Sequence, residues 1–460
     1  MFALEAWAGG LGALALWIVL REPGILPRRA RLFLIAPGAL SAVGLLQLAP
    51  LPSSWTWLGS PAATARRVIG TVVPEAALGS SPWSLSPPDT VDALLRLAAY
   101  ALIGLAAFVS LREERHVRQA AALIAVSGAF QALYGSAEYL SGHQHIFGFA
   151  KTHYLSEATG TFINRNHFAG YLAMTLPFSL GLAIASLGRP RGREGAEGLR
   201  KALRDWLDST RPAALLAAGA ALVTWTGVIL SYSRAGLAAA VLASATSVIV
   251  LRLDRRRAIA LVVALAIPLL SLLWLEIRAP GERFAAVGNE LSSRTGRLAV
   301  WRTTVDLIGA HPLLGYGLGT FESAYGPHRA FAARIRYDHA HNDWLEALLE
   351  GGIGAVLVLA GLLGLAVRPA FAREGRASER SGLAKCAAGG VLAIALHSLT
   401  DFCLRIPAIA VLLAVLLAIL AREGERSREP EETIRFPVPP ARDERTPTPR
   451  PTTPRSPRTR

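Results

Sequence analysis

Two histidines stand among acidic and amide groups in the stretch "YDHAHNDWLEALLEGGIG", residues 337–354. Asn342 or Asp343 can cap a helix that begins at this point. His339 and His341 then lie just outside the positive end of that helix, which disfavours the charged imidazolium. Because a general base must be uncharged to accept a proton, the stretch predicts a histidine base. Either histidine can fill that role, and the alternative for each is a hydrogen-bonded helix cap.

A metal site is the competing interpretation of the same stretch. Asp338, His339, His341 and Asp343 offer nitrogen and oxygen ligands within six residues, and alternate residues of an extended strand point the same way. The chain contains no HExxH, no paired cysteines and no Asp-x-Asp, however. We therefore favour a general base, and expect neither a metal nor any other cofactor.

Three arginines elsewhere in the chain could hold an anion. Arg234, in "SYSRAG", occupies a short connection between two apolar segments, where arginine is unusual unless it binds a negative group or reaches the lipid headgroups. Arg297 and Arg302 flank Trp301 in a predicted amphipathic helix. Taken singly, these two arginines are typical of a solvated helix face. Converging on one pocket, the arginines would suit a phosphate or diphosphate, which accepts forked hydrogen bonds.

A fourth polar cluster is "GTFINRNHFAG", residues 160–170. Asn164, Arg165, Asn166 and His167 stand together at the end of an apolar segment, where each polar side chain costs free energy unless it finds a partner. One asparagine suffices for a helix cap. The remaining polar groups predict contact with a ligand.

The elements that must position these residues are membrane spans. The chain has 460 residues, of which 52% are hydrophobic, and a mean hydropathy of +0.37. The apolar residues form long blocks, which predicts an all-α polytopic membrane protein with about 11 spans, within a range of 10 to 12. The predicted spans are 3–20, 32–50, 92–110, 119–139, 167–187, 213–230, 235–251, 258–275, 351–367, 386–400 and 407–421.

The basic residues fix the orientation of these spans. The formal net charge of +15 could indicate a nucleic-acid partner, but most of the basic residues lie in every second connection between the predicted spans, and therefore on one side of the membrane. The positive-inside rule makes those connections cytoplasmic, and it places all four polar clusters on the outer side. A transmembrane domain, 1–421, therefore carries a large periplasmic loop, 276–350. The proline- and arginine-rich segment 422–460 is predicted to be a disordered cytoplasmic tail.

Five motifs, in order, resemble those of the O-antigen ligase and polymerase superfamily of bacterial membrane glycosyltransferases. They are "GTFINRNHFAGYLAM", "SYSRAG", "GRLAVWRTTVDLIGAHPLLGYGLGTFE", "HAHNDWLEALLEGGIG" and "HSLTDFCLRIPA". Together with the span pattern they cover most of residues 92–421. The resemblance implies a glycosyltransferase C-type membrane fold.

The resemblance also implies roles for individual residues. His341 matches the loop histidine that would serve as base, with His339 as the competing candidate. Arg234 and Arg297 match the two arginines that would hold the diphosphate of the donor. The expected substrate-binding residues are Asn164, Arg165, Asn166, Arg302, His339 and Asn342.

The implied reaction transfers a glycan from a polyprenyl-diphosphate donor, such as one built on undecaprenyl diphosphate, to an acceptor hydroxyl at the periplasmic face of the bacterial inner membrane. An inverting, metal-independent mechanism is expected, and lipid A-core is the leading acceptor, as in lipopolysaccharide biosynthesis. The alternatives are a polymerase that extends O-antigen or exopolysaccharide and a protein O-oligosaccharyltransferase. From a different class, a solute or bicarbonate transporter would require ionisable residues at mid-span, where Arg96 is the main candidate.

Overall fold

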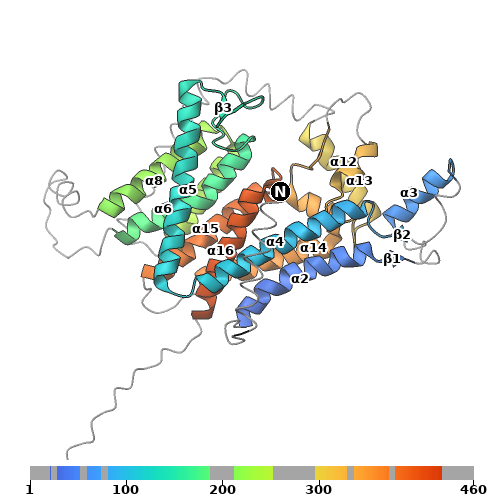
Figure 1. Ribbon diagram of the computed structural model, residues 1–460, viewed down its shortest axis with the longest axis horizontal. Helices are drawn as coiled ribbons and strands as arrows, with labels where there is room; N and C mark the ends of the chain where they lie inside the picture. The colour runs from blue at the N-terminus through green and yellow to red at the C-terminus, as the bar shows by residue number, and fades with distance from the viewer. Residues whose placement is uncertain are drawn as a thin grey trace, which may run out of the picture. The chain divides into compact units, whose positions relative to one another are not determined.

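The computed structural model describes residues 21, 28–51, 60–73, 81–186, 212–251, 296–328, 336–371 and 379–426. The predicted spans 3–20 and 258–275 lie outside the described residues, as does the tail beyond residue 426. The described part is almost entirely helical (Figure 1). Its helices are α2 (Arg28–Leu48), α3 (Pro61–Gly70), α4 (Pro87–Ser110), α5 (Glu114–Ser141), α6 (Arg165–Ser186), α8 (Pro212–Leu230), α9 (Arg234–Leu251), α12 (Arg297–Ala310), α13 (Phe321–Tyr325), α14 (Asp343–Val367), α15 (Glu379–His397) and α16 (Pro407–Arg426).

The strands and 3-10 turns of the described chain are short. Strand β1 (Pro50–Leu51) pairs antiparallel with β2 (Ser81–Pro82), and β3 (His145–Ile146) pairs antiparallel with β4 (Phe149–Ala150). Three 3-10 turns, η4 (Gly326–His328), η5 (Arg368–Phe371) and η6 (Cys403–Arg405), lie between or follow helices. These pieces shape connections and leave the all-α character of the fold intact.

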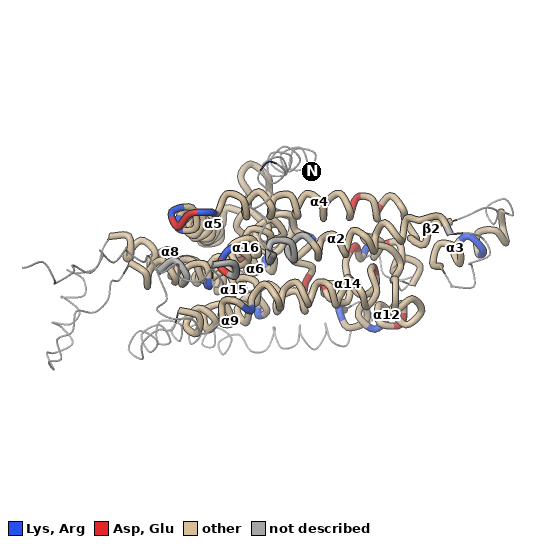
Figure 2. Tube along the Cα trace, turned by 90° about the horizontal axis from the view of Figure 1, so that it is seen from below, with Lys and Arg blue, Asp and Glu red and all other residues tan. Residues whose placement is uncertain are grey.

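Six helices of the described chain are long and apolar enough to cross a membrane, so the protein is a multi-pass membrane protein. They are Pro87–Ser110, Glu114–Ser141, Arg165–Ser186, Pro212–Leu230, Arg234–Leu251 and Asp343–Phe371, and the segments Ile35–Leu48 and Gly382–His397 are shorter apolar helices. The predicted total of about 11 spans is thus not confirmed. Figure 2 shows charged residues gathered near helix ends, as at the start of α5.

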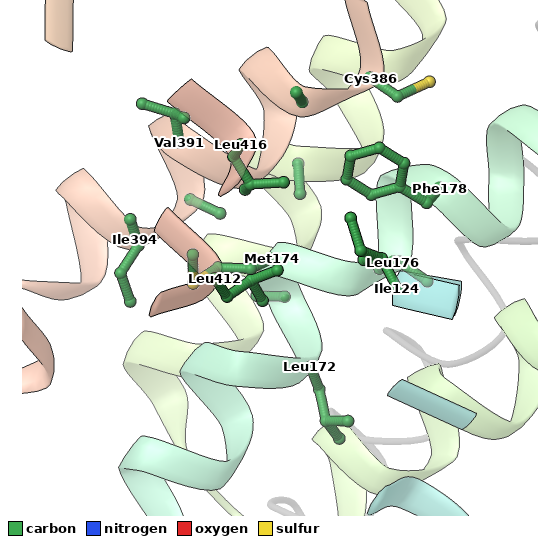
Figure 3. Close-up of a cluster of buried hydrophobic side chains, with 14 of the residues drawn as sticks. Ile124, Leu172, Met174, Leu176, Phe178, Cys386, Val391, Ile394, Leu412 and Leu416 are labelled. Carbon is green, nitrogen blue, oxygen red and sulfur yellow. The ribbon is translucent and has the colours of Figure 1, made fainter. Parts of the chain in front are cut away.

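The core of the bundle forms around α6, which packs against α5, α8, α9 and α15. Close helix approach depends on small residues, as is usual between membrane helices. A Cβ added at Gly227 of α8 would lie 2.8 Å from the Cβ of Ala132, and one at Gly390 of α15 would lie 2.7 Å from the carbonyl oxygen of Met174. Figure 3 shows the buried side chains that fill this core, including Met174 and Phe178. The core fixes the ends of α6 and α15 relative to each other.

Helix α14 begins at Asp343, eight residues before the predicted span 351–367, and is interrupted at Gly352. Gly352 has φ +67°, a conformation that favours glycine, and a Cβ there would lie 2.1 Å from the carbonyl oxygen of Leu313. The interruption frees carbonyl groups that a continuous helix would use internally. The amide of Tyr316 donates to the Leu349 carbonyl at 2.9 Å, and that of Gly317 donates to the Glu350 carbonyl at 3.0 Å.

Gln47 of α2 completes this junction. Its fully buried side-chain amide donates to the Leu314 carbonyl at 2.6 Å and to the Glu350 carbonyl at 2.8 Å, and its oxygen accepts from the amide of Leu318 at 2.9 Å. These hydrogen bonds hold the motif "HPLLGYGLG", which follows α12, against the interruption of α14 at Gly352. The first two turns of α14, which carry the polar residues of the opening stretch, gain a fixed position.

Candidate functional site

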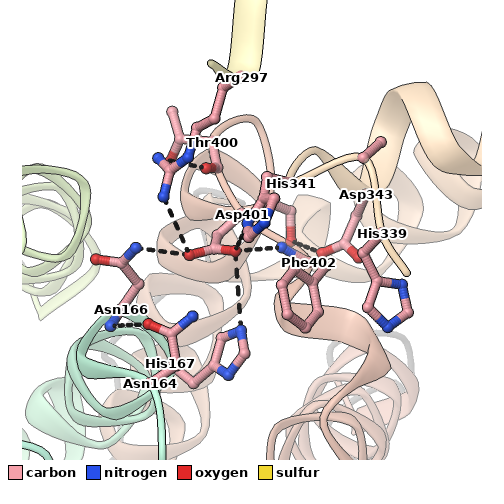
Figure 4. A network of polar contacts seen from close by, with 12 residues as sticks. Asn164, Asn166, His167, Arg297, His339, His341, Asp343, Thr400, Asp401 and Phe402 are labelled. Carbon is pink, nitrogen blue, oxygen red and sulfur yellow. Dashed lines mark hydrogen bonds and ion pairs between the residues drawn. The ribbon is translucent and has the colours of Figure 1, made fainter. Parts of the chain in front are cut away.

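A buried carboxylate, Asp401, lies in the centre of the polar residues at one end of the bundle (Figure 4). It follows α15, and side chains from three other parts of the chain approach it. The ring of His341 lies 2.9 Å from Oδ1, and the Asn166 amide donates to Oδ2 at 2.6 Å. The Arg297 guanidinium reaches within 4.0 Å of Oδ2. Residues far apart in the sequence thus meet at one carboxylate.

The environment of Asp401 keeps it ionised. Burial would by itself raise its pKa, but the hydrogen bond from His341, together with the nearby His167 and Arg297, lowers the pKa well below the usual carboxyl range. An ionised carboxylate only accepts hydrogen bonds. Nδ1 of His341 must therefore carry the proton of that 2.9 Å contact. In the uncharged ring, Nε2 then holds the lone pair, which is the form that a general base needs.

The backbone around His341 is held in an unusual conformation. His341 has φ +52°, which is uncommon for a residue with a side chain. On one side, the indole of Trp301 donates to the Ala340 carbonyl at 2.8 Å. On the other, the Asn342 side chain caps α14 by accepting from the amides of Trp344 and Leu345, each at 3.1 Å. These contacts turn the imidazole toward Asp401.

His339 faces a different carboxylate. Its Nδ1 lies 2.9 Å from Oε1 of Glu346, a side chain that is 1% exposed. Burial lowers the pKa of His339, but the hydrogen bond and charge of Glu346 outweigh that effect, and the pKa is raised. The helix end was expected to disfavour the charged form of His339, and the direction of the pKa shift is the opposite, because a carboxylate in contact outweighs a helix dipole.

The ring of Phe402 separates the two histidines. His339 stacks on it at 4.2 Å between ring centroids and 23° between planes, whereas His341 meets it edge-on at 4.9 Å and 69°. His167 of α6 also meets it edge-on, at 4.6 Å. The idea that both histidines of the loop point the same way thus fails, since each binds its own carboxylate across this ring.

The predicted arginines occupy distinct places. Arg297 begins α12 and donates to the Thr400 carbonyl at 3.2 Å, which ties it to the loop that carries Asp401. Arg302 is exposed on α12, five residues later, and therefore on a different helix face from Arg297. Arg234 is exposed as the first residue of α9.

Arg234 belongs to the same end of the bundle as Asp401. A Cβ added at Gly236 would lie 2.3 Å from the Cβ of Ala169, so the start of α9 packs on the start of α6. A Cβ added at Gly170 would lie 3.5 Å from the sulfur of Cys403. The starts of α6 and α9 and the loop after α15 therefore lie together.

The four residues of "NRNH" make four different contacts. Asn164 begins α6 by accepting from the amide of Asn166 at 2.8 Å on its side chain. Arg165 forms an ion pair with Glu157 at 2.7 Å, and Asn166 donates to Asp401. His167 lies 3.8 Å from Asp401. Asn164, Arg165 and Asn166 thus have protein hydrogen-bond partners, whereas the buried Nε2 of His167 has none in the described part of the chain. Of the four residues, Asn166 and His167 approach the central carboxylate.

With this geometry established, residues 219–360 match the family model described as O-antigen ligase. This match supports the resemblance to the O-antigen ligase superfamily that the five motifs indicate. A search of curated proteins finds no match. The family implies a glycosyltransferase-type enzyme with a lipid-linked glycan donor and a glycan or lipid acceptor.

The O-antigen ligase match covers part of the site. It includes Arg234, Arg297, His339 and His341, whereas Asp401 lies beyond its end. Asn166 precedes its start. The fold brings the segments that carry Asn166 and Asp401, which lie outside the matched range, next to the matched residues. Asp401 is the carboxylate that His341 contacts.

Several residues of this candidate site were not singled out from the sequence. Asp401 and Phe402 stand in "HSLTDFCLRIPA", a motif that carried the family resemblance without a role for any one residue. Glu346, Glu350 and Arg405 were likewise not assigned to the site. The available signal was an acidic residue in an otherwise apolar segment, because buried carboxylates need charged or hydrogen-bonding partners.

Proposed function

We propose that this protein transfers a glycan from a polyprenyl-diphosphate-linked donor to an acceptor hydroxyl at the periplasmic face of the inner membrane. His341 is the base, and Arg297 and Arg234 hold the donor diphosphate. The observation that carries the proposal is the hydrogen bond between His341 Nδ1 and the buried Asp401, with Arg297 beside the same carboxylate. This arrangement orients an imidazole in the way that serves acyl-transfer enzymes, although the reaction here is different.

The chemistry requires a base and fixed positive charge. As the acceptor oxygen attacks the anomeric carbon, its proton passes to Nε2 of His341. The bond from that carbon to the phosphate oxygen breaks, and its electron pair leaves with the diphosphate. Guanidinium groups stabilise the negative charge that develops on this leaving group. A single displacement of this kind inverts the anomeric centre.

Asp401 supports the choice of His341 over His339 as the base. Its carboxylate fixes the proton on Nδ1 and stabilises the imidazolium that forms when the ring accepts a second proton. The guanidinium of Arg297 also approaches this carboxylate, within 4.0 Å of Oδ2.

Lipid A-core is the acceptor that we propose, and polymerisation of a lipid-linked glycan and glycosylation of protein hydroxyls share the same chemistry. The test offers all three acceptors, with a polyprenyl-diphosphate oligosaccharide, to membranes that contain the wild type, His341→Ala or His339→Ala. We expect one of the three acceptors to be used by the wild type, and we expect transfer to that acceptor to fall by about 100-fold or more in the His341 variant. Undiminished transfer by a membrane-inserted His341→Ala protein would exclude that residue as the base.

The periplasmic location has its own test. Asp306 is exposed on α12, and the two native cysteines, Cys386 and Cys403, are buried. In intact spheroplasts that contain Asp306→Cys, a membrane-impermeant maleimide added from outside should label the introduced cysteine. Labelling that requires permeabilised membranes would place α12 on the cytoplasmic side and remove the proposed site from the periplasm.

A further inference from the structure

A second group of buried charges lies beside the His341–Asp401 pair. Glu346 and Glu350 stand four residues apart on α14, and their side chains are 1% and 2% exposed. Arg405 contacts both, with Nε 3.1 Å from Glu346 and its terminal nitrogen bonded to Glu350. One guanidinium therefore faces two carboxylates. We call these three residues, with His339, the α14 charge cluster.

His339 is the neighbouring group that can balance the surplus negative charge. Its Nδ1 contacts the same Glu346 oxygen that Arg405 contacts, and its ring stacks on the face of Phe402. A cation over an aromatic face is favourable, and a buried carboxylate is strongly destabilised without a positive partner. The side chain of His339 remains 25% exposed, so it stays open to the outside of the cluster.

Other charged groups act on His339 from the surrounding segments. Asp338, its own neighbour in the loop, raises the pKa of His339, and Arg405 on η6 lowers it. His167 on α6 and His341 lie on other sides of Phe402. The net direction, after burial and Glu346 are included, is a raised pKa.

The two histidines of the loop therefore differ in charge balance although both contact a carboxylate through Nδ1. Asp401, which contacts His341, has the guanidinium of Arg297 as an additional positive partner within 4.0 Å. In the α14 charge cluster two carboxylates share one guanidinium, and the ring of His339 contacts one of those carboxylates, that of Glu346.

We propose that the α14 charge cluster holds His339 as an imidazolium, and that this fixed positive charge is a third contact for the diphosphate of the donor, beside the two arginines. The inference rests on the proposed function for the identity of the anion. It assigns the two histidines opposite states: one stays charged to bind the leaving group, and the other stays uncharged to accept the proton of the acceptor.

The charge state is measured first, without any substrate. Histidine labelled with ¹³C at Cε1 is titrated by NMR in the detergent-solubilised full chain, and the His339 signal is assigned by its loss in His339→Gln. We expect it to titrate above 6.5, the ordinary histidine pKa. Glu346→Gln should lower that midpoint by about one pH unit or more, and Glu350→Gln, which removes charge without touching His339, should lower it by less. Glu322→Gln, an exposed carboxylate on α13, is the matched control and should leave it unchanged. A wild-type midpoint at or below 6.5, or one that Glu350→Gln does not move, would overturn the inference.

The binding role is measured with undecaprenyl diphosphate that carries no glycan, in nanodiscs, at pH values on both sides of the midpoint found by NMR. The wild type should bind about tenfold or more weakly at the higher pH, where His339 has lost its charge. His339→Gln should bind weakly at both pH values, and His339→Lys should bind tightly at both. Equal affinity of wild type and His339→Gln at the lower pH would refute the diphosphate contact.

These outcomes are distinguishable from failure of the proposed function. Diphosphate binding that follows the charge of His339, in a protein that transfers no glycan to any acceptor, would sustain the inference and remove the glycosyltransferase proposal. Glycan transfer and diphosphate binding that do not change with the charge of His339 would sustain the glycosyltransferase proposal and remove the inference.

Discussion

Asp401→Asn is the substitution that most directly tests the site, because it removes a charge while preserving shape. The carboxylate accepts at Oδ1 from His341 at 2.9 Å and from the amide of Phe402 at 3.0 Å, and at Oδ2 from Asn166 at 2.6 Å. An asparagine has one acceptor oxygen and one amide nitrogen. Whichever way it is oriented, its NH2 group faces donors that previously had an acceptor.

The two orientations have different consequences for His341. If the new amide nitrogen takes the Oδ1 position, the imidazole must turn Nδ1 into an acceptor, which moves its proton to Nε2 and blocks the base. If the nitrogen takes the Oδ2 position, it faces the Asn166 amide and Arg297, and the charge that stabilises the imidazolium is still lost.

Either orientation loses a hydrogen bond to a charged group and leaves a donor unsatisfied, which together costs about 2–4 kcal/mol. In a transition state that needs the imidazolium, this corresponds to a loss of about 30- to 1,000-fold in kcat/KM.

The assay measures kcat/KM for glycan transfer in proteoliposomes, with thermal unfolding to check that each variant is folded. Asp306→Asn makes the same chemical change at an exposed position of α12 and should retain wild-type kcat/KM. His341→Gln and the double variant complete a cycle, and because the two residues act as a unit, the double variant should lose little more than the worse single variant. A folded Asp401→Asn protein within threefold of the wild type, or losses that multiply in the double variant, would refute the coupling of these residues.

Three further predictions concern stability and binding. Gly352→Ala should lower the unfolding temperature in detergent, because Gly352 has φ +67° and a Cβ there would meet a carbonyl oxygen at 2.1 Å, while Gly361→Ala in the same helix, where a Cβ meets nothing within 4 Å, should not. Because the folded pKa of His339 is raised, its stabilising contribution should be complete below the ordinary value of 6.5 and disappear as the pH rises through the folded pKa. His339→Gln should therefore flatten the decline of unfolding temperature above pH 6.5, and an equally steep decline would contradict the ion pair with Glu346. Arg297→Lys should raise KM for the donor by about tenfold or more, since an ammonium cannot reproduce the forked guanidinium contact, and an unchanged KM would argue against a diphosphate at this position.

The sequence was informative where chemistry is local. Apolar blocks predicted α4, α5, α6, α8 and α9 close to their observed bounds, since a span must satisfy its own backbone hydrogen bonds and therefore shows its length in the sequence. The start of α14 was predicted less well. Its first two turns contain Glu346 and Glu350, which broke the apolar pattern although both are buried.

Most of the predicted site residues could be recognised as polar groups at span ends, but their tasks could not be assigned. Asn164 and Asn166 are identical in type and two residues apart, yet one caps α6 and the other donates to Asp401. Arg297 and Arg302 are likewise alike in sequence, and only Arg297 reaches Thr400. The choice depends on which face of a helix meets a neighbouring segment.

By itself, the sequence indicated a helical membrane protein that resembles the O-antigen ligase superfamily, with histidines and arginines gathered at span ends, because hydropathy and motif spacing are properties of short stretches. Only the tertiary structure decided which carboxylate faces which histidine. His339 and His341 are two residues apart, but Glu346 lies on the following helix and Asp401 lies 60 residues beyond His341. The charge of an imidazole depends on the groups within a few ångströms of it, and helix packing brings those groups from distant parts of the chain.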